Sequence, residues 1–412
     1  MAYAGSYQSQ VFAAGGSPFP FTAKGLEEAA LDNLPREYFD YIAGGAGSER
    51  TVAANEAAFS RWGLIYRVLR DGVAADASST LLGTPMSVPV MLAPAGVADL
   101  AHPEAERAAA RAAERVGAVQ VLSAVTSVSL EEVAQAAPRG RRWFQFAWPD
   151  DEKLARSLIE RAEAAGYGAL VVMGDCYVAG WRTRELSSGF FPFRHAHGLG
   201  NYVSDRRFWE LAGFGSMPED LDDLTSEMVA AAASTWNRVF TKPALLPEDL
   251  AVLRSWTRMP IVVKGVCHPD EATRLCEAGI DALIVSNHGG RQLDGGVAAL
   301  DCLPPVVAAV AGRVPVLFDS GVRTGTDVLI ALALGADAVM IGRPWLYGLA
   351  VGGQAGVEHV LRSLREEFTS ALALTGHRRC SSLSTDDVFP VVPPHGPRDP
   401  GSGIARKGAT RS

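Results

Sequence analysis

The sequence lacks an excess of basic residues and any long apolar run. Its 412 residues include 38 Lys and Arg against 46 Asp and Glu, a formal net charge of −8. This balance argues against nucleic acid as a partner, because binding to a phosphate backbone requires a basic face. No apolar run reaches the roughly 18 residues that a membrane-spanning helix needs. The N-terminal residues lack a basic stretch followed by an apolar one, so we expect no secretory signal.

Cysteine is scarce as well. The five cysteines, at positions 176, 267, 276, 302 and 380, are scattered, and no two of them have the spacing of a metal site or a redox pair. We therefore expect reduced thiols in a cytoplasmic protein. With 48% hydrophobic and 20% charged residues, the composition is typical of a globular protein with ample material for a core.

Short apolar runs alternate with helical patterns from residue 88 onward. This alternation is typical of a parallel sheet whose strands are joined by crossover helices. Eight strands, each followed by a helix, is the number that closes a (β/α)8 TIM barrel. An open doubly wound sheet more commonly has about five or six. We therefore predict a TIM barrel with strands over 88–93, 119–122, 143–146, 169–173, 261–264, 282–285, 314–318 and 338–341.

The pattern divides the chain into three parts. Residues 1–24, rich in Gly, Ser, Ala and Pro, predict a loose leader. Residues 25–392 predict a single barrel domain, which opens with a helical segment over 25–43 that two glycines terminate. Residues 393–412 show no apolar periodicity, so we expect a disordered tail.

The interval between the fourth and fifth predicted strands is longer than one crossover helix requires. Its part 187–215 is rich in Gly, Pro, aromatic residues and His, which predicts an irregular lid over one face of the barrel. Its part 222–239 predicts a helix.

The stretch 286–295, SNHGGRQLDG, follows the sixth predicted strand. It places a titratable base, His288, three residues before a fixed cation, Arg291, with two glycines between them. A turn needs glycine for its backbone but needs neither of these side chains. The pattern favours a proton acceptor beside an anion clamp that a flat ligand can approach closely. A hydrogen-bonded turn with a surface arginine is the structural alternative.

The seventh and eighth predicted strands both end in glycine and arginine. The segments are 319–325, DSGVRTG, and 342–344, GRP. Backbone N–H groups freed by glycine, with Arg323 and Arg343, are the donors that a phosphate requires, and TIM barrels commonly bind phosphate there. Two solvated arginines are the alternative. Lys264 ends the fifth strand, where a buried ammonium needs an anionic partner or ligand.

The stretch 286–295 resembles the motif of the FMN-dependent α-hydroxy-acid oxidising enzymes, the family of glycolate oxidase, lactate oxidase and mandelate dehydrogenase. The resemblance extends from about residue 7 to residue 387. The segments 180–182 (GWR), 189–193 (GFFPF) and 201–205 (NYVSD), with the long lid, resemble the lactate 2-monooxygenase branch, which forms acetate, carbon dioxide and water from L-lactate. The resemblance implies FMN as cofactor, a 2-hydroxy acid and dioxygen as reactants, and a homo-oligomer, either a tetramer or an octamer.

The resemblance assigns catalytic roles. His288 would take the hydroxyl proton while the α-hydrogen leaves for the flavin. Asp319 is the expected partner that orients His288, by the usual pairing of a base with an orienting group. Lys264 would stabilise the negative charge of the reduced flavin, although a salt bridge to a carboxylate on a neighbouring strand is its structural alternative.

The resemblance also assigns binding roles. Arg182, Arg291 and Tyr41 would hold the substrate carboxylate. The positions that would bind FMN are Pro94, Ala95, Gly96, Ser123, Gln145, Met173, Lys264, Ser286, Asp319, Ser320, Gly321, Val322, Arg323, Gly342 and Arg343.

Three positions depart from the family pattern. Ala147 stands where a tyrosine normally contacts the substrate oxygen, Met173 replaces a threonine that meets the flavin, and Val125 stands where glycolate oxidase has tryptophan. Loss of the tyrosine removes a hydrogen bond worth about 1 kcal/mol and opens volume. It predicts a pocket for a 2-hydroxy acid larger than lactate. Neutral drift with slower turnover is the alternative.

The sequence thus predicts an FMN-dependent enzyme that oxidises a 2-hydroxy acid to the 2-keto acid, with dioxygen as acceptor and without a metal. Decarboxylation of the keto acid in place is a further outcome that the resemblance allows. A catalytically impaired flavin-binding scaffold and a dehydrogenase that uses another acceptor stay open as alternatives. A further alternative is a phosphate-binding barrel of the isomerase or aldolase type, and such a protein would be colourless because it would carry no flavin.

Overall fold

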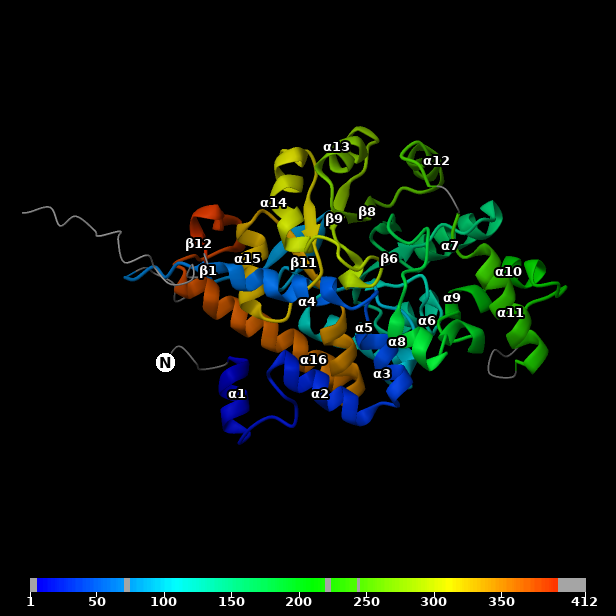
Figure 1. Ribbon diagram of the computed structural model, residues 1–412, viewed down its shortest axis with the longest axis horizontal. Helices are drawn as coiled ribbons and strands as arrows, with labels where there is room; N and C mark the ends of the chain where they lie inside the picture. Colours follow the sequence, from blue (N-terminus) through cyan, green and yellow to red (C-terminus); the bar gives the residue numbers. More distant parts are fainter. Residues whose placement is uncertain (1–5, 70–74, 219–223, 243–244, 392–412) are drawn as a thin grey trace, which may run out of the picture.

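The computed structural model describes residues 6–69, 75–218, 224–242 and 245–391. Eight parallel strands form a closed barrel in the order β10-β11-β4-β5-β6-β7-β8-β9, with helices around it (Figure 1). The predicted TIM barrel is therefore confirmed. The strands are β4 (Val90–Leu92), β5 (Val119–Leu122), β6 (Arg141–Phe146), β7 (Leu170–Met173), β8 (Ile261–Val266), β9 (Ala282–Val285), β10 (Val316–Phe318) and β11 (Ala338–Ile341).

The barrel strands are apolar on both faces because both faces are covered. One set of side chains fills the barrel interior, including Met91, Val121, Trp143, Ile284 and Met340. The alternate set packs outward against the helices. The outer helices are α5 (Ala105–Val116), α6 (Leu130–Ala136), α7 (Glu152–Ala164), α12 (Asp249–Trp256), α13 (Pro269–Glu277), α14 (Ala299–Val310), α15 (Gly325–Ala333) and α16 (Arg343–Leu374).

The N-terminal part is more structured than the sequence predicted. The single helix expected over 25–43 is two helices, α2 (Ala23–Asn33) and α3 (Arg36–Ala43). Leu34 between them is extended, because the proline that follows disfavours helical backbone in the residue before it. Within the expected loose leader, α1 (Tyr7–Ala13) contacts α16. Helix α4 (Arg50–Ala57) follows α3 along the chain.

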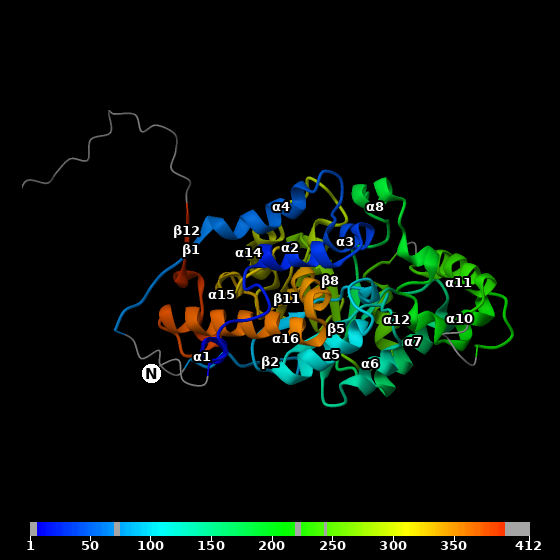
Figure 2. The ribbon, with the colours of Figure 1, turned by 90° about the horizontal axis from the view of Figure 1, so that it is seen from below.

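Two small antiparallel sheets complete the fold. Strands β2 (Ser79–Leu81) and β3 (Thr84–Met86) pair with each other, and their Leu81 and Met86 join the apolar cluster inside the barrel. Strands β1 (Trp62–Leu64) and β12 (Val388–Pro390) pair at one end of the molecule, and α10 (Arg206–Leu211) and α11 (Ser226–Val239) lie at the other (Figure 2).

The predicted irregular lid over 187–215 contains short helices. They are α8 (Thr183–Ser188), η3 (Pro192–His195), α9 (Gly200–Val203) and α10 (Arg206–Leu211), and the longer α11 (Ser226–Val239) follows them. The Thr225 side chain caps α11 by accepting from Met228 N–H, so this predicted helix starts later than expected. Residues 222–223 and the predicted tail 393–412 lie outside the described residues. No helix in the described part of the chain has the length and apolar character to cross a bilayer.

Candidate active site

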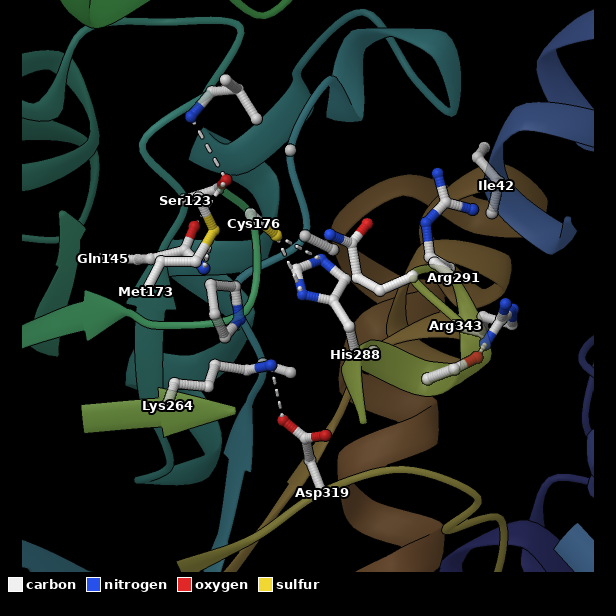
Figure 3. A pocket seen from close by; sticks show the side chains of 18 of the residues that line it. Ile42, Ser123, Gln145, Met173, Cys176, Lys264, His288, Arg291, Asp319 and Arg343 are labelled. Carbon is white, nitrogen blue, oxygen red and sulfur yellow. Dashed lines mark hydrogen bonds and ion pairs between the residues drawn. The ribbon is translucent and has the colours of Figure 1, made fainter. Parts of the chain in front are cut away.

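A cavity of about 380 Å³ opens at the C-terminal ends of the barrel strands (Figure 3). In this fold functional residues lie at that end. All eight strands or the loops after them contribute to its lining. The contributions, from β4 through β11, include Pro94, Ser123, Gln145, Met173, Lys264, His288, Asp319 and Ile341.

The structure brings most predicted site residues to this cavity. The predicted residues that line it are Tyr41, Pro94, Ala95, Gly96, Ser123, Gln145, Met173, Arg182, Lys264, His288, Arg291, Asp319, Ser320, Gly321, Val322, Arg323, Gly342 and Arg343. Two predicted residues, Ala147 and Ser286, are not among the lining residues. Ser286 lies behind the wall, where it holds two lining side chains in place.

Lys264 is a buried cation that pairs with Asp319. Its Nζ lies 3.1 Å from Asp319 Oδ2 and donates to Ser286 Oγ over 2.8 Å. Ser286 Oγ in turn donates to Asp319 Oδ1 over 2.6 Å. Burial alone would lower the pKa of Lys264, but the carboxylates of Asp319 and Asp175 raise it. The ammonium therefore stays charged at the cavity wall.

The prediction that Asp319 orients His288 is wrong. His288 Nδ1 lies 3.0 Å from Asp175 Oδ2, and Asp175 follows β7, the strand next to β8. Asp319 is instead engaged by Lys264 and Ser286. The sequence showed no pairing signal, because an aspartate after a strand is equally typical of a turn.

The turn that presents His288 requires its glycines. His288 and Gly289 both have left-handed backbone, with φ of 58° and 61°, and Gly290 follows with φ of 76°. A non-glycine residue rarely adopts this conformation. The amide of His288 donates to Ser286 Oγ over 3.1 Å, so the strained residue is anchored to the Lys264 and Asp319 network.

Electrostatics keep His288 neutral. Burial lowers the pKa of His288, and Lys264 lowers it further against the opposing pull of Asp175. The pKa of Asp175 is itself lowered, because His288 and Lys264 outweigh the effect of its burial. A neutral imidazole bonded to an ionised carboxylate through Nδ1 leaves Nε2 to accept a proton.

Cys176 is a neighbour of His288 that the sequence did not single out as a site residue. Its Sγ lies 3.4 Å from His288 Nδ1 and 3.5 Å from Asp175 Oδ1, and it lines the cavity. Burial raises the pKa of this thiol well above its ordinary value, and Asp175 adds to that effect. The only available signal was its position directly after Asp175 at the end of a strand.

The guanidinium groups of Arg182 and Arg291 and the phenol of Tyr41 also line the cavity, and Arg291 lies beside His288 (Figure 3). The Arg291 guanidinium carbon is 5.1 Å from the centre of the Tyr41 ring, and Arg291 Nη1 donates to the carbonyl oxygens of Tyr41 and Gly44. Burial lowers the pKa of Arg291, and the neighbouring Arg182 lowers it further. Such a pair of close cations favours an anion between them.

A carboxylate of the protein itself occupies that position. Glu185 Oε1 lies 3.3 Å from Arg291 Nη2 and 3.6 Å from Arg182 Nη1. Its place on α8, three residues after Arg182, brings it back toward the same guanidinium. This contact shows that the two arginines can share one carboxylate. The sequence reasoning missed Glu185.

The predicted phosphate donors line the cavity on the side of β10 and β11. Arg343 donates to the carbonyl oxygens of Ala43, Gly44 and Gly289. Burial, together with Arg291, lowers the pKa of Arg343 to about 10. Arg343 also begins α16, whose next N–H groups, those of Trp345 and Leu346, donate to the Gly342 carbonyl oxygen. Arg323 pairs with Glu56 over 2.6 Å.

Aromatic residues cover the mouth of the cavity. Phe193 stacks on Trp236 with ring centres 4.2 Å apart, and Trp236 lies 4.5 Å from Phe240. All three line the cavity, and Trp236 lies on α11. Ala147 does not line the cavity and is buried, so the volume expected from the missing tyrosine does not open there.

A buried carboxylate holds the two loops that form the cavity floor. Glu106 on α5 accepts from the backbone N–H of Ala98, after β4, and of Ser127, after β5. Burial raises the pKa of Glu106 to about 7. These loops carry Gly96 and Val125, which line the cavity.

Comparison with known proteins agrees with this geometry. Residues 30–389 match the family described as FMN-dependent dehydrogenase. The chain is 40% identical over 369 residues to L-lactate oxidase of Lysinibacillus sphaericus, covering 90% of this chain and 92% of that protein. It is 41% identical over 358 residues to 4-hydroxymandelate oxidase of Amycolatopsis orientalis, covering 87% and 94%.

Solved structures lead to the same family. A crystal structure of mandelate oxidase superposes with a TM-score of 0.75 at 38% identity, covering 88% of this chain and 96% of that one. The eight-stranded barrel, the cavity at its C-terminal end and the family match over most of the chain agree. The chain therefore belongs to the FMN-dependent dehydrogenase family: it is an oxidoreductase of the 2-hydroxy-acid oxidase type, and FMN is its cofactor.

Proposed function

We propose that the cavity oxidises a 2-hydroxy acid carrying an apolar or aromatic side chain to the 2-keto acid, with dioxygen as the final acceptor. The observation that carries the proposal is that a base and a pair of cations meet in one cavity. The neutral His288 lies beside Asp175, and the nearby Arg182 and Arg291 have a carboxylate between them.

The residues present fit FMN. Arg323 and the buried Arg343, which both line the cavity, suit its phosphate. Lys264, held charged by Asp319, suits the edge of a ring that gains negative charge on reduction. An added Cβ at Gly342 would meet no atom within 4 Å, so the backbone there is open to a ligand. When bound, the flavin supplies the two-electron acceptor for the α-hydrogen.

The chain's own residues position and deprotonate the substrate. The carboxylate of the acid displaces Glu185 and binds Arg182 and Arg291. The Tyr41 phenol, whose pKa burial raises, stays protonated and can donate to the same carboxylate. His288 Nε2 accepts the hydroxyl proton, and Asp175 stabilises the resulting imidazolium through Nδ1.

The substrate's side chain would face the aromatic cover. Phe193 stacks on Trp236, Phe240 packs against Trp236 at a tilt, and Met173 adds an adaptable apolar surface. This group, rather than the space at Ala147, supports a substrate larger than lactate.

Anaerobic mixing tests the proposal. The FMN-loaded protein is mixed with glycolate, lactate, mandelate and a long-chain aliphatic 2-hydroxy acid, and flavin absorbance is followed. We expect bleaching, fastest with mandelate or the long-chain acid. Absence of bleaching by every acid would contradict the oxidation, and fastest bleaching by glycolate would contradict the assigned side-chain site.

Admission of air to the bleached protein tests the acceptor. Rapid return of the oxidised spectrum supports dioxygen, whereas slow return with rapid reoxidation by an artificial quinone would identify a dehydrogenase. Hydrogen peroxide and carbon dioxide measured in the same reaction distinguish release of the keto acid from its decarboxylation in place.

A further inference from the structure

Asp175, Cys176 and His288 form a compact group with three different donor atoms. Their ligand atoms all lie within 4.8 Å of one another. Among the residues that the structure describes, no other group of three His, Cys, Asp or Glu side chains is close enough to share an ion. The proposed reaction uses the carboxylate and the imidazole but gives the thiol no role.

The distances within the group suit a tetrahedral ion. Zinc binds sulfur at about 2.3 Å and nitrogen or oxygen at about 2.0–2.2 Å, so neighbouring ligands of one ion lie roughly 3.3–3.6 Å apart in tetrahedral geometry. The Cys176 sulfur lies 3.4 Å from His288 Nδ1 and 3.5 Å from Asp175 Oδ1. Asp175 Oδ2 lies 3.0 Å from the same nitrogen. Because the thiol meets Oδ1 and the imidazole meets Oδ2, a rotation of the Asp175 carboxylate would bring one oxygen to the ion and complete a three-ligand site.

The chemistry of the donors selects the ion. One thiolate, one imidazole and one carboxylate are the ligands that zinc prefers, whereas magnesium and calcium require oxygen ligands. The thiolate and the carboxylate together balance a charge of +2, so Lys264 and Arg182 nearby would face a neutral centre. Cys176 and His288 line the cavity and Asp175 lies behind them, which leaves a fourth position on the cavity side for water or a substrate oxygen, as in sites with an open coordination position.

We propose that Asp175, Cys176 and His288 form an inhibitory site for a thiophilic divalent cation of the zinc type. Binding converts the Cys176 thiol to a thiolate, releases that proton to solvent, and takes the Nδ1 lone pair of His288. The ring proton then resides on Nε2, because a neutral imidazole carries one N–H. Nε2 becomes a donor and can no longer accept the hydroxyl proton. The inhibition rests on the proposed role of His288, whereas the binding does not.

Zinc titration of the FMN-loaded, chelator-treated protein tests the site. The variant is Cys176→Ser, which keeps a hydroxyl but loses the soft ligand, and the control is Cys276→Ser, which removes a half-buried thiol on α13 outside the cavity. Calorimetry should detect one zinc ion per chain in the unmodified protein and in the control. Cys176→Ser should bind it at least tenfold more weakly. Equal affinity in all three proteins would overturn the site.

A second measurement needs no substitution. Iodoacetamide is added with and without zinc, and the modified cysteines are mapped by mass spectrometry. Zinc should protect Cys176 but not Cys276, and equal labelling of Cys176 under both conditions would overturn the site even if Cys176→Ser does not fold.

Measuring turnover with and without zinc distinguishes a failure of the zinc site from a failure of the proposed function. We expect zinc to inhibit the unmodified protein and the Cys276→Ser control at the concentrations that fill the site. In Cys176→Ser, with activity normalised to that of the same variant without zinc, the inhibition constant should be at least tenfold higher. Thiol-dependent binding without inhibition would overturn the inhibitory role. Absence of turnover in the metal-free protein would contradict the proposed function and leave the binding result unaffected.

Discussion

At the scale of single residues, the structure pairs His288 with Asp175 instead of the predicted Asp319, and it adds Cys176 as a neighbour. The pairing of His288 with Asp175 rather than Asp319 follows from barrel geometry, because the ends of strands that are distant in sequence meet at one mouth. A sequence shows which strands carry acids but not which acid faces which base. The residue types of the site were predictable from glycine, arginine and lysine at strand ends, whereas its internal contacts were not.

The first prediction concerns Asp175→Asn. Without the carboxylate, His288 loses the group that fixes its tautomer and stabilises its protonated form. We expect the anaerobic rate of flavin reduction to fall by about 10²- to 10⁴-fold, with FMN still bound, as measured by stopped-flow absorbance.

Asp319→Asn is the matched comparison. This change removes the partner of Lys264 and leaves the pair of His288 and Asp175 intact, so it should alter the flavin reduction potential more than the proton transfer. A large fall in rate for Asp319→Asn and none for Asp175→Asn would restore the original assignment.

The second prediction concerns Gly265, which lies at an irregularity in β8 with φ of 104°. A Cβ built there would lie 2.7 Å from the Cβ of Asp175. Gly265→Ala should therefore combine backbone strain with displacement of Asp175, lowering stability by about 1–3 kcal/mol and slowing flavin reduction.

Gly166→Ala separates the two effects. Gly166 also has positive φ, at 75°, but an added Cβ there meets nothing within 4 Å. It should lower the melting temperature through strain alone and leave reduction unchanged. Equal reduction rates in both variants would show that Asp175 does not depend on the space at Gly265.

At the scale of elements, α5 supports the cavity floor through a buried acid. Glu106 links the loops after β4 and β5 through their backbone N–H groups. The capping box of α6, with Ser129 and Glu132, appears in the structure as the sequence motif indicates. The break between α2 and α3 was not predicted, because an apolar face that continues across Pro35 outweighed the proline in the sequence pattern.

The third prediction is a dependence of stability on pH that requires Glu106. Its pKa is about 7 in the folded protein and roughly 4.3 in an unfolded chain. The folded state therefore binds more protons between these values, so stability is highest at low pH and falls as pH rises toward 7. The contribution is on the order of 3 kcal/mol.

Denaturant titrations at several pH values measure this contribution. In Glu106→Gln the decline between about pH 4.5 and 7 should become shallower than in the unmodified protein. Identical slopes in the two proteins would show that Glu106 titrates normally in the folded state.

At the scale of the whole molecule, the barrel was predictable because its strands are short apolar runs at regular intervals. In the excursion between β7 and β8, α11 was predictable, whereas α8, α9 and α10 were not, because they are too short to show a clear period. A group of exposed apolar side chains on the segments after β7 and β9 points to self-association. Tyr177, Val178, Trp181 and Leu293 are largely exposed, and their segments are joined by the hydrogen bond from Gln292 Nε2 to the Val178 carbonyl oxygen.

The fourth prediction is that this apolar strip is covered in a homo-oligomer, a tetramer or octamer as the family resemblance implies. Contiguous exposed apolar side chains commonly mark an interface. Light scattering after size exclusion should give a mass several times that of the chain, and Trp181→Glu with Leu293→Glu should lower it. A monomeric mass for the unmodified protein would contradict the prediction.

The contact of Glu185 with both arginines has a consequence for which molecules enter. At the proposed site, an incoming acid would exchange one carboxylate for another, so the charge balance around the two arginines would be preserved. An ester or amide of the same acid offers no such exchange and would leave two cations facing an internal anion that it cannot replace. We therefore expect the resting protein to select ligands by their charge before any chemistry begins.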